Sequence, residues 1–243
     1  MSISISAEKL FSLFNFPITN ALVVSFIITL FLVIAAILIN RRLKKDGVPG
    51  KTQNFTELII EGAFDFIHST IGDYKKARKL FALVFTFFVF VLFNNWVELW
   101  PGLGYVGLKE HHSIIPIIRS PSADLNTTLA LAVISVLATQ FLGIAAIGAV
   151  KYFSKFLNFQ SPIKMFVGLL ELISEISKII SFSFRLFGNI FAGEVLLIVS
   201  YYLIPYLAPL PFLVMEFFVG IIQAFIFSIL TLSFIQVATF SEE

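Results

Sequence analysis

The sequence predicts an all-α polytopic membrane protein with five membrane-crossing helices, the last two forming a long tilted hairpin, and one amphipathic surface helix. Of its 243 residues, 58% are hydrophobic and 13% are charged, and the mean hydropathy is +0.95. Several apolar runs reach about twenty residues or more, which suffices for a helix to cross a hydrocarbon core of ~30 Å. We therefore expect residues 1–243 to form a single membrane domain. The sequence contains no cysteine, which excludes disulfides and thiolate sites.

The five expected crossings differ in length. Residues 162–204 would form a helix of about 64 Å at ~1.5 Å per residue, roughly twice the thickness of the hydrocarbon core. The following run is also too long for a perpendicular crossing. Three prolines separate these two runs, so the pair predicts a steeply inclined helical hairpin. In chain order, the expected crossings cover residues 18–39, 76–98, 124–150, 162–204 and 212–240.

Basic residues are concentrated on one side of the expected crossings. Residues 40–79 carry nine Lys or Arg, whereas the opposite side holds Lys9, Lys109 and Arg119. The positive-inside rule then places the N-terminus outside and the C-terminus in the cytoplasm. No secretory or mitochondrial presequence is evident. These features favour the plasma membrane of a bacterium over an organelle.

Residues 52–71 predict the amphipathic helix on the cytoplasmic surface. Apolar side chains such as Phe55 and Leu58 recur at helical spacing, and acidic residues such as Glu57 and Glu61 lie on the other face. Anionic lipid would repel that acidic face, so we expect a protein neighbour here.

Arg185 lies deep inside the fourth apolar run. A guanidinium at that depth costs about 2.5–3.5 kcal/mol to insert, so by default it marks a function. Because arginine does not release its proton in proteins, Arg185 is a fixed charge and not a proton carrier. Steps of seven, seven and four residues place Glu171, Lys178, Arg185 and Asn189 on one polar stripe of the helix. Lys178 is also positioned to snorkel to the cytoplasmic interface.

Buried carboxyl groups occur at different depths. Glu194 faces away from Arg185 on the same helix, and Glu216 shares a face of the last helix with Gln223. Glu194 and Glu216 lie in the outer half of the bilayer, whereas Glu171 lies toward the cytoplasm. Carboxyl groups in a low dielectric exchange protons nearer neutral pH, and two neighbouring acids titrate as a coupled pair. An acid route from each side, with a fixed cation between them, predicts a divided proton path.

Other polar residues give weaker signals. Asp124 and Asn126 begin the third run, where helix N-capping is the favoured interpretation. Glu98 lies near the outer surface, where a solvated helix end is equally consistent. His111 and His112 lack a third ligand at metal spacing, so a solvated loop is favoured over a metal site. No motif predicts a metal, a cofactor, nucleotide hydrolysis or nucleic-acid binding.

Three sequence blocks resemble subunit a of the F-type ATP synthase. The first is SFSFRLFGN at residues 181–189, followed by AGE at residues 192–194. The others are PSADLNTTL at residues 121–129 and QAFIF at residues 223–227. The blocks occur in the family's order, and the similarity spans most of the chain.

This resemblance implies a proton-conducting stator subunit whose tilted hairpin faces a rotating ring of c subunits. It implies that the surface helix packs near a b-type peripheral stalk and that ATP forms on other subunits. Arg185 would face the rotor carboxylates and separate two aqueous half-channels. The outer half-channel would contain Glu194, Glu216, Asp124, Asn126 and Glu98, the inner one would contain Glu171 and Glu175, and Asn189 and Gln223 would lie near the arginine.

The chain departs from some relatives at Glu216, where they carry His, so both members of its pair with Glu194 are acidic. Two nearby carboxylates also suit a sodium site, although the ion choice in this family lies mainly in the c ring. From the residues alone, two other functions stay open. A self-contained secondary ion transporter would have inverted repeats and broken helices. A membrane scaffold would use its polar residues only to join helices, an equally good interpretation of Asn189 and Gln223.

Overall fold

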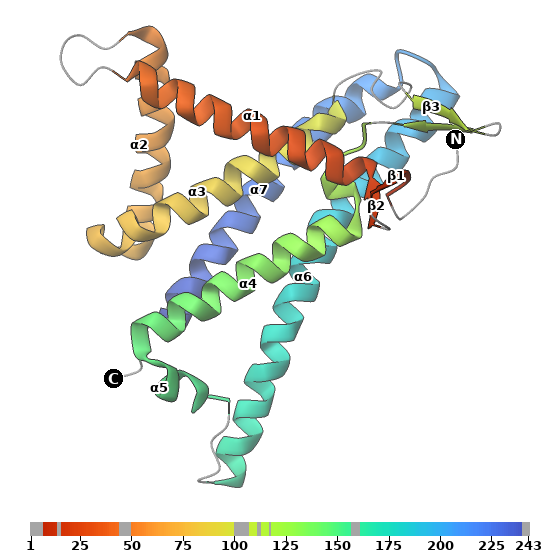
Figure 1. The fold of residues 1–243 in the computed structure, drawn as a ribbon. Helices are drawn as coiled ribbons and strands as arrows, with labels where there is room; N and C mark the ends of the chain where they lie inside the picture. Colours follow the sequence, from red (N-terminus) through yellow and green to blue (C-terminus); the bar gives the residue numbers. More distant parts are fainter. Residues whose placement is uncertain are drawn as a thin grey trace.

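The computed structural model describes residues 7–13, 16–43, 50–99, 107–110, 113–116, 118–156 and 161–239 (Figure 1). Five helices are long and apolar enough to cross a membrane, which confirms the predicted all-α polytopic membrane fold. His111 and His112 lie outside the described residues, as does the side chain of Glu98 in the short helical turn η1 (Val97–Leu99). The five helices are α1 (Asn20–Arg42), α3 (Tyr74–Trp96), α4 (Leu125–Ile147), α6 (Pro162–Leu203) and α7 (Pro209–Thr239).

Local sequence explains where two of these helices differ from the expected crossings. α4 ends at Ile147, three residues early, because Gly148 adopts a φ of +89°. This backbone conformation favours glycine and stops the helix. α7 begins at Pro209, three residues early, because the missing N–H of proline is tolerated in the first turn of a helix.

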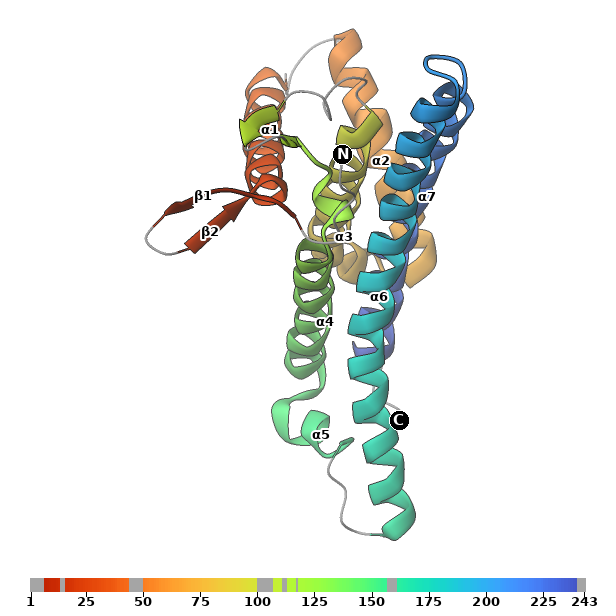
Figure 2. The same cartoon turned by 90° about the vertical axis from the view of Figure 1, so that its right-hand side faces the viewer.

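α6 and α7 form a long helical hairpin that runs the length of the molecule (Figure 2). They contain 42 and 31 residues, or about 63 and 46 Å. Both exceed a hydrocarbon core of ~30 Å, so they must incline within the membrane or project from it. The hairpin turns at residues 204–208. We call this end of the bundle the turn end and the opposite end, which carries α2, the α2 end.

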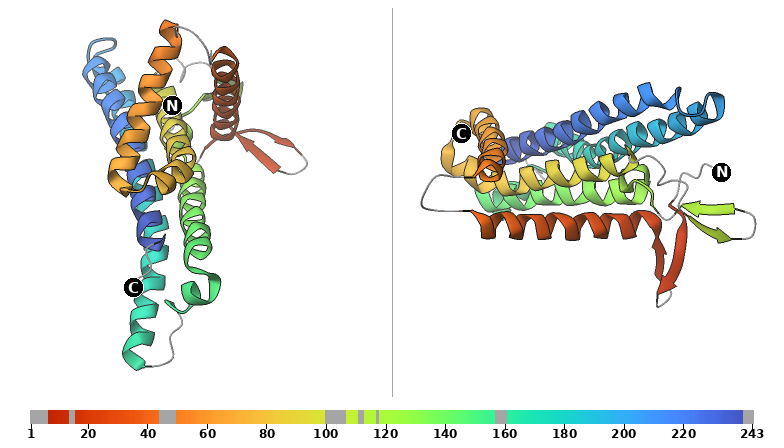
Figure 3. Two further views of the ribbon diagram at one scale, coloured as in Figure 1. Left: turned by 90° about the vertical axis from the view of Figure 1, so that its left-hand side faces the viewer. Right: turned by 90° about the horizontal axis from the view of Figure 1, so that it is seen from above.

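The core lies between α3, α4, α6 and α7, and α1 packs along the side of this group (Figure 3). Phe182 of α6 meets Phe227 of α7 with ring centroids 5.0 Å apart. Ser135 of α4 and Thr231 of α7 share a buried hydrogen bond of 2.8 Å. Such hydroxyl pairs join helices where apolar burial alone gives little driving force. The largest cluster of buried apolar residues consists of Phe87, Val91, Leu131, Ala132, Phe182, Leu186, Ala224 and Phe227.

α2 (Lys51–Ile71) is the amphipathic helix, and it crosses the start of α3 at the α2 end (Figure 1). Its Phe64 ring meets Tyr74 and Phe81 of α3 at centroid distances of 5.4 and 5.6 Å. Phe55 and Leu58 are exposed, so the helix presents apolar surface beyond its contact with α3. This surface needs a membrane or another subunit to cover it.

The junction between α2 and α3 is fixed by backbone geometry and a helix cap. Gly72 ends α2 with a φ of +76°. Asp73 then caps α3, because its carboxylate accepts hydrogen bonds from the backbone N–H groups of Lys75 and Lys76 at 2.8 and 3.3 Å. These hydrogen bonds lower the pKa of Asp73 below its ordinary value.

Three short features, two strand hairpins and one helix, are not predicted from the sequence pattern. β1 (Lys9–Leu13) pairs with β2 (Phe16–Thr19), and β3 (Gly107–Glu110) pairs with β4 (Ser113–Pro116), each as an antiparallel hairpin. Both hairpins lie at the turn end (Figure 3). The third element is the five-residue helix α5 (Ala149–Phe153). Segments this short carry too few residues for periodicity to identify them.

Tyr152 of α5 packs against the last turns of α4, at the α2 end of the bundle. Its side chain is buried, and its hydroxyl donates to Gln140 Oε1 of α4 at 2.5 Å. A Cβ on Gly143 would lie 2.5 Å from the Tyr152 ring, so only glycine allows this approach. Burial raises the pKa of Tyr152 to about 12, and the charges of Glu175 and Glu171 add to the shift. The hydroxyl therefore stays protonated at neutral pH and can keep donating.

The buried hydroxyl pair between α4 and α7 gives a stability prediction. Ser135→Ala is expected to lower the free energy of unfolding by about 0.6 to 1.7 kcal/mol, because it leaves the Thr231 hydroxyl without this partner. Reversible unfolding of the purified chain in mixed detergent micelles measures the change. Ser177→Ala is the matched control, since that hydroxyl bonds only the backbone of its own exposed turn. Equal losses in both variants would contradict the prediction.

Candidate functional site

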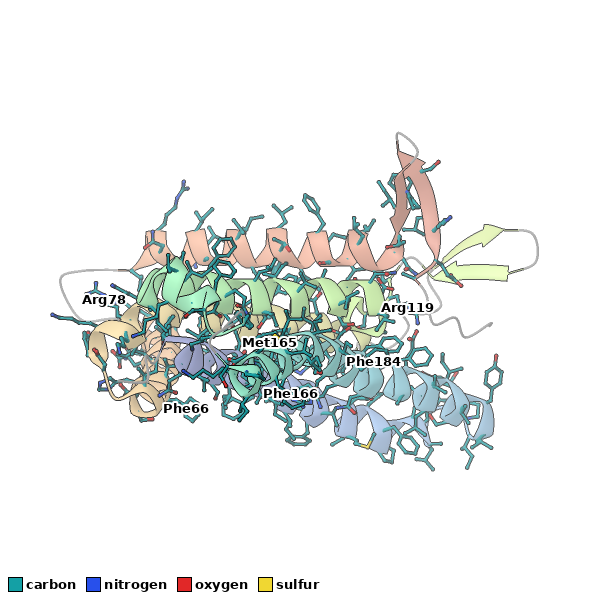
Figure 4. The ribbon with its side chains drawn as sticks, turned by 90° about the horizontal axis from the view of Figure 1, so that it is seen from below. Phe66, Arg78, Arg119, Met165, Phe166 and Phe184 are labelled. Carbon is teal, nitrogen blue, oxygen red and sulfur yellow. The ribbon has the colours of Figure 1, made fainter. Side chains whose placement is uncertain are left out.

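Arg185 lies on an exposed face of α6. The side chains of Ser181, Arg185 and Asn189 are exposed, whereas Phe182 and Leu186 turn into the core. Arg185 Nη2 donates to Ser181 Oγ at 3.4 Å. Within the described residues, no carboxylate lies within ion-pair distance of this guanidinium. The same exposed stretch of α6 includes Phe184 (Figure 4).

This placement gives the chain an uncompensated positive charge on its outer surface. α6 is apolar enough to cross a membrane, so the charge is costly there unless an anion or water from outside the chain meets it. Arginine stays protonated in proteins, so proton loss cannot remove the cost. The arrangement can hold an anion against α6, and it cannot itself carry a proton.

Glu194 points away from Arg185, as its position nine residues later predicts. Its Oε2 accepts hydrogen bonds from Arg119 Nε and Nη2 at 3.3 and 3.0 Å. Arg119 comes just before the short helical turn η3 (Pro121–Ala123). The Arg119 side chain is 6% exposed and that of Glu194 is 22% exposed. This is therefore a largely buried ion pair between α6 and the segment that leads into α4.

Glu216 of α7 is 3% exposed and rests against α6. A Cβ on Gly193 would collide with the Glu216 carboxyl group, so the two helices approach through this glycine. Glu194 is the next residue on α6, which brings the two acids into the same region. The sequence predicts both acids in the outer half of the bilayer, but it does not reveal that Arg119 pairs with Glu194.

Buried polar groups of α3 complete this region at the turn end. Asn95 Nδ2 donates to the Gly220 carbonyl of α7 at 3.1 Å, and Ser120 Oγ donates to the Asn94 carbonyl at 2.9 Å. The Oδ1 atoms of both asparagines and the Oγ atom of Ser122 are buried without a hydrogen-bond partner in the described structure. Such atoms mark places where a polar ligand or water is favourable. We call the following residues the turn-end polar cluster: Asn94, Asn95, Arg119, Ser120, Ser122, Asp124, Glu194 and Glu216.

Asp124 occupies the N-cap position of α4, as expected, but its side chain does not bond to the backbone there. Its carboxylate accepts from Asn126 Nδ2 at 3.4 Å and from Thr127 Oγ1 at 3.1 Å. Asp124 is buried, whereas Asn126 is exposed. The carboxylate therefore joins a side-chain network and does not cap the helix.

The acids at the α2 end are arranged differently. Glu171 is exposed. Glu175 Oε1 accepts from Lys178 Nζ at 2.6 Å, and its Oε2 is buried without a partner in the described structure. Lys178 Nζ lies 4.6 Å from the ring centroid of Phe234 on α7. Lys178 thus turns toward α7 instead of following the exposed stripe that contains Arg185, because pairing and a cation–π contact stabilise it there.

The two residues predicted to lie near Arg185 belong to different helices. Asn189 is exposed one turn along α6, whereas Gln223 is buried on α7. No hydrogen bond among the described residues joins either amide to Arg185. Across the residues that the structure describes, no group of three His, Cys, Asp or Glu side chains is arranged to hold a metal ion.

Sequence reasoning missed Arg119 and Gly193. Arg119 counts only as a loop charge in the topology argument, although a nearby acidic residue deep in a membrane helix signals the need for a cation. Gly193 precedes Glu194 in a run with no turn signal, and its role appears only when α7 is packed against it.

Comparisons with known proteins identify the family. The family model for the ATP synthase A chain matches residues 22–236. ATP synthase subunit a of Campylobacter jejuni (strain RM1221) is 39% identical over 220 residues, which cover 89% of this chain and 88% of that protein. The subunit a of Geotalea daltonii is 36% identical over 220 residues, covering 89% and 86% of the two chains. ATP synthase subunit a 3 of Pelobacter propionicus is 36% identical over 219 residues with the same coverage. The chain therefore belongs to the ATP synthase A chain family, as a non-catalytic subunit of the membrane sector.

Proposed function

We propose that this chain is a proton-conducting stator subunit in which two half-channels, separated by Arg185, load and unload carboxylates on a ring of c subunits. The observation that carries the proposal is the exposure of Arg185 on a membrane-crossing helix without a carboxylate partner among the described residues. A charge placed in this way needs an anion from another subunit. A rotor carboxylate passing α6 meets that need.

The turn end supplies the outer half-channel. Its polar cluster combines the buried acids Glu216 and Asp124 with the ion-paired Glu194. The unpartnered oxygens of Asn94, Asn95 and Ser122 favour hydration of the same region. We assign the exposed Asn126 and the η1 residue Glu98 to the mouth of this route. Protons reach the rotor from this side.

The α2 end supplies the inner half-channel. Glu171 is exposed there, and Glu175 keeps a buried oxygen free of partners within the described structure. Tyr152 holds α5 against the same end of α4 through its hydrogen bond to Gln140, and the charges of both acids contribute to its raised pKa. A proton that leaves the rotor passes these acids to the cytoplasm.

Arg185 separates the two routes, so a rotor site passes from one to the other only by turning through lipid. An ionised rotor carboxylate is attracted to the guanidinium, whereas a protonated one is neutral and enters lipid at little cost. A rotor site therefore loads at the turn end, travels through lipid and releases its proton after nearly a full turn. Each charge that crosses the membrane supplies about 2.3 kcal/mol per 100 mV, and this energy becomes torque.

The remaining surfaces suit the other partners and the proposed topology. The exposed face of α6 around Arg185 receives the c ring, and we assign Asn189 of α6 and Gln223 of α7 to the same approach. The uncovered apolar side of α2 receives a b-type peripheral stalk subunit. The basic segments favour a topology with the α2 end and the C-terminus in the cytoplasm and the N-terminus outside, and we assign the chain to the plasma membrane of a bacterium.

A self-contained secondary transporter is less consistent with the fold. Such transporters bind substrate at helices that break and unwind near the membrane centre. Here α6 is helical from Pro162 to Leu203 and α7 from Pro209 to Thr239, without interruption. A pure scaffold would not need an arginine on an exposed face, because its polar groups would pair within the bundle.

Replacement of Arg185 tests the proposal directly. Arg185→Ala is expected to reduce proton-driven ATP synthesis at least ~10²-fold, the size of the loss when one preorganised electrostatic group is removed. Synthesis in reconstituted vesicles and subunit composition should be measured together, because the complex is expected to assemble. Arg78→Ala, an exposed position at the start of α3, is the control. Wild-type synthesis in an assembled Arg185→Ala complex would refute the mechanism.

Replacement of the buried outer acid tests the assignment of the entry route. Glu216→His is expected to remain functional but to need a more acidic outside medium for half-maximal synthesis. Burial favours the uncharged form of a side chain, and that form carries the exchangeable proton in Glu but has lost it in His. Synthesis rates at varied outside pH and constant potential measure the shift. Met215→His, on the exposed side of α7, should leave the profile unchanged; an unshifted Glu216→His profile would count against proton entry at this residue.

A further inference from the structure

Arg119 is the one buried arginine among the described residues, and it sits at the junction of three elements. Its side chain lies at the turn end, where it contacts Glu194 of α6 (Figure 4). Both Nε and Nη2 donate to the same oxygen of Glu194, at 3.3 and 3.0 Å. A hydrogen bond between two ionised groups is stronger than one between neutral groups, so the two bonds hold this carboxylate oxygen beside the guanidinium.

The titratable groups around this pair are unequally placed. Glu8, in the segment before β1, is close enough for its charge to act on Glu194. Asp124 is engaged by Asn126 and Thr127. The α3 helix contributes only the neutral Asn94 and Asn95 to this region, and the side chain of Glu98 in η1 lies outside the described part. Glu216 has neither an ion-pair nor a hydrogen-bond partner within the described residues.

We propose that Arg119 is a positioning residue of the outer route, which holds Glu194 as a stationary carboxylate and leaves Glu216 as the acid that exchanges protons. This inference rests on the proposed function. Arginine never releases its proton, so Glu194 always has a cation beside it, and the two hydrogen bonds hold its carboxylate there. Glu216 is buried against Gly193, one residue from this fixed pair, and lacks a cation of its own.

The pair also sets the geometry of the entry route. Glu194 belongs to α6 and Arg119 precedes η3, so their hydrogen bonds tie the turn end of the rotor-facing helix to the start of α4. Gly193 and Glu216 lie directly beside this tie. Loss of Arg119 would leave Glu194 without its cation in the same region as Glu216, so Glu194 could then exchange protons as well.

A double-mutant cycle in the assembled complex tests this role. The variants are Arg119→Ala, Glu194→Gln and the combined Arg119→Ala/Glu194→Gln, with Arg119→Lys as the conservative replacement and Arg78→Ala as the matched control. Each complex is reconstituted in vesicles, and proton-driven ATP synthesis is measured at varied outside pH with constant inside pH and potential. The subunit composition of every complex is checked before the assay.

Arg119→Ala is expected to lower the rate about tenfold and to change the shape of the outside-pH profile, and Arg119→Lys is expected to restore most of the rate. Glu194→Gln keeps an amide oxygen that accepts hydrogen bonds from Arg119, so proton entry should stay at Glu216 and the outside-pH profile should shift less than that of Glu216→His. The combined variant should be faster than Arg119→Ala and regain the wild-type profile, because it removes both charges together.

Three outcomes would overturn the proposal while leaving the role of Arg185 intact. One is a Glu194→Gln profile shifted as far as that of Glu216→His, which would make Glu194 a proton carrier. Another is a combined variant no faster than Arg119→Ala, which would remove the coupling. The third is that Arg119→Ala and the combined variant both fail to assemble while Glu194→Gln assembles, which would give Arg119 a purely structural role. A failure of the proposed function itself would appear separately, as normal synthesis in Arg185→Ala.

Discussion

A permanent positive charge on an exposed face of a membrane-crossing helix constrains everything packed behind it. Arg185 cannot be neutralised by losing its proton, and no carboxylate among the described residues compensates it. Its insertion cost of about 2.5–3.5 kcal/mol must be recovered outside the chain. The helix that presents it therefore has to be held in one orientation. Phe182 and Leu186 anchor the opposite face in the core, and the Arg119–Glu194 pair fixes the turn end.

The 3.6-residue period of α6 separates two electrostatic environments on one helix. Arg185 and Glu194 are nine residues apart, which places them on opposite faces and about 13 Å apart along the axis. The arginine faces outward, whereas the glutamate faces the segment before α4. An acid on the same face as Arg185, one helical turn away, would neutralise it and remove the attraction that we propose for a rotor carboxylate. The spacing prevents that internal pairing and leaves Glu194 to find a cation elsewhere.

Features set by local periodicity could be predicted from the sequence, and features set by tertiary packing could not. The membrane helices, the exposed stripe with Arg185 and the opposite direction of Glu194 follow from composition and helical geometry. The Arg119–Glu194 pair joins residues 75 positions apart, so it depends on how η3 packs against α6. Lys178 is different: its partner Glu175 is only three residues away, but the seven-residue spacing to Arg185 suggests a shared stripe. The contact with Phe234 of α7 decides its direction.

Glu194 and Glu216 lie in the same region of the turn end, and among the described residues only Glu194 has a cation partner. If Glu194 and Glu216 were both unpaired, burial and mutual repulsion would favour a single shared proton, and neither would present a constant charge to the other. Arg119 breaks that symmetry by pairing with Glu194 and not with Glu216. Gly193 then becomes essential, because any side chain there would displace the Glu216 carboxyl group from the contact with α6. A fixed pair, a glycine and one unpartnered acid thus form a graded environment, and we propose that the acid without a cation is the group that exchanges protons.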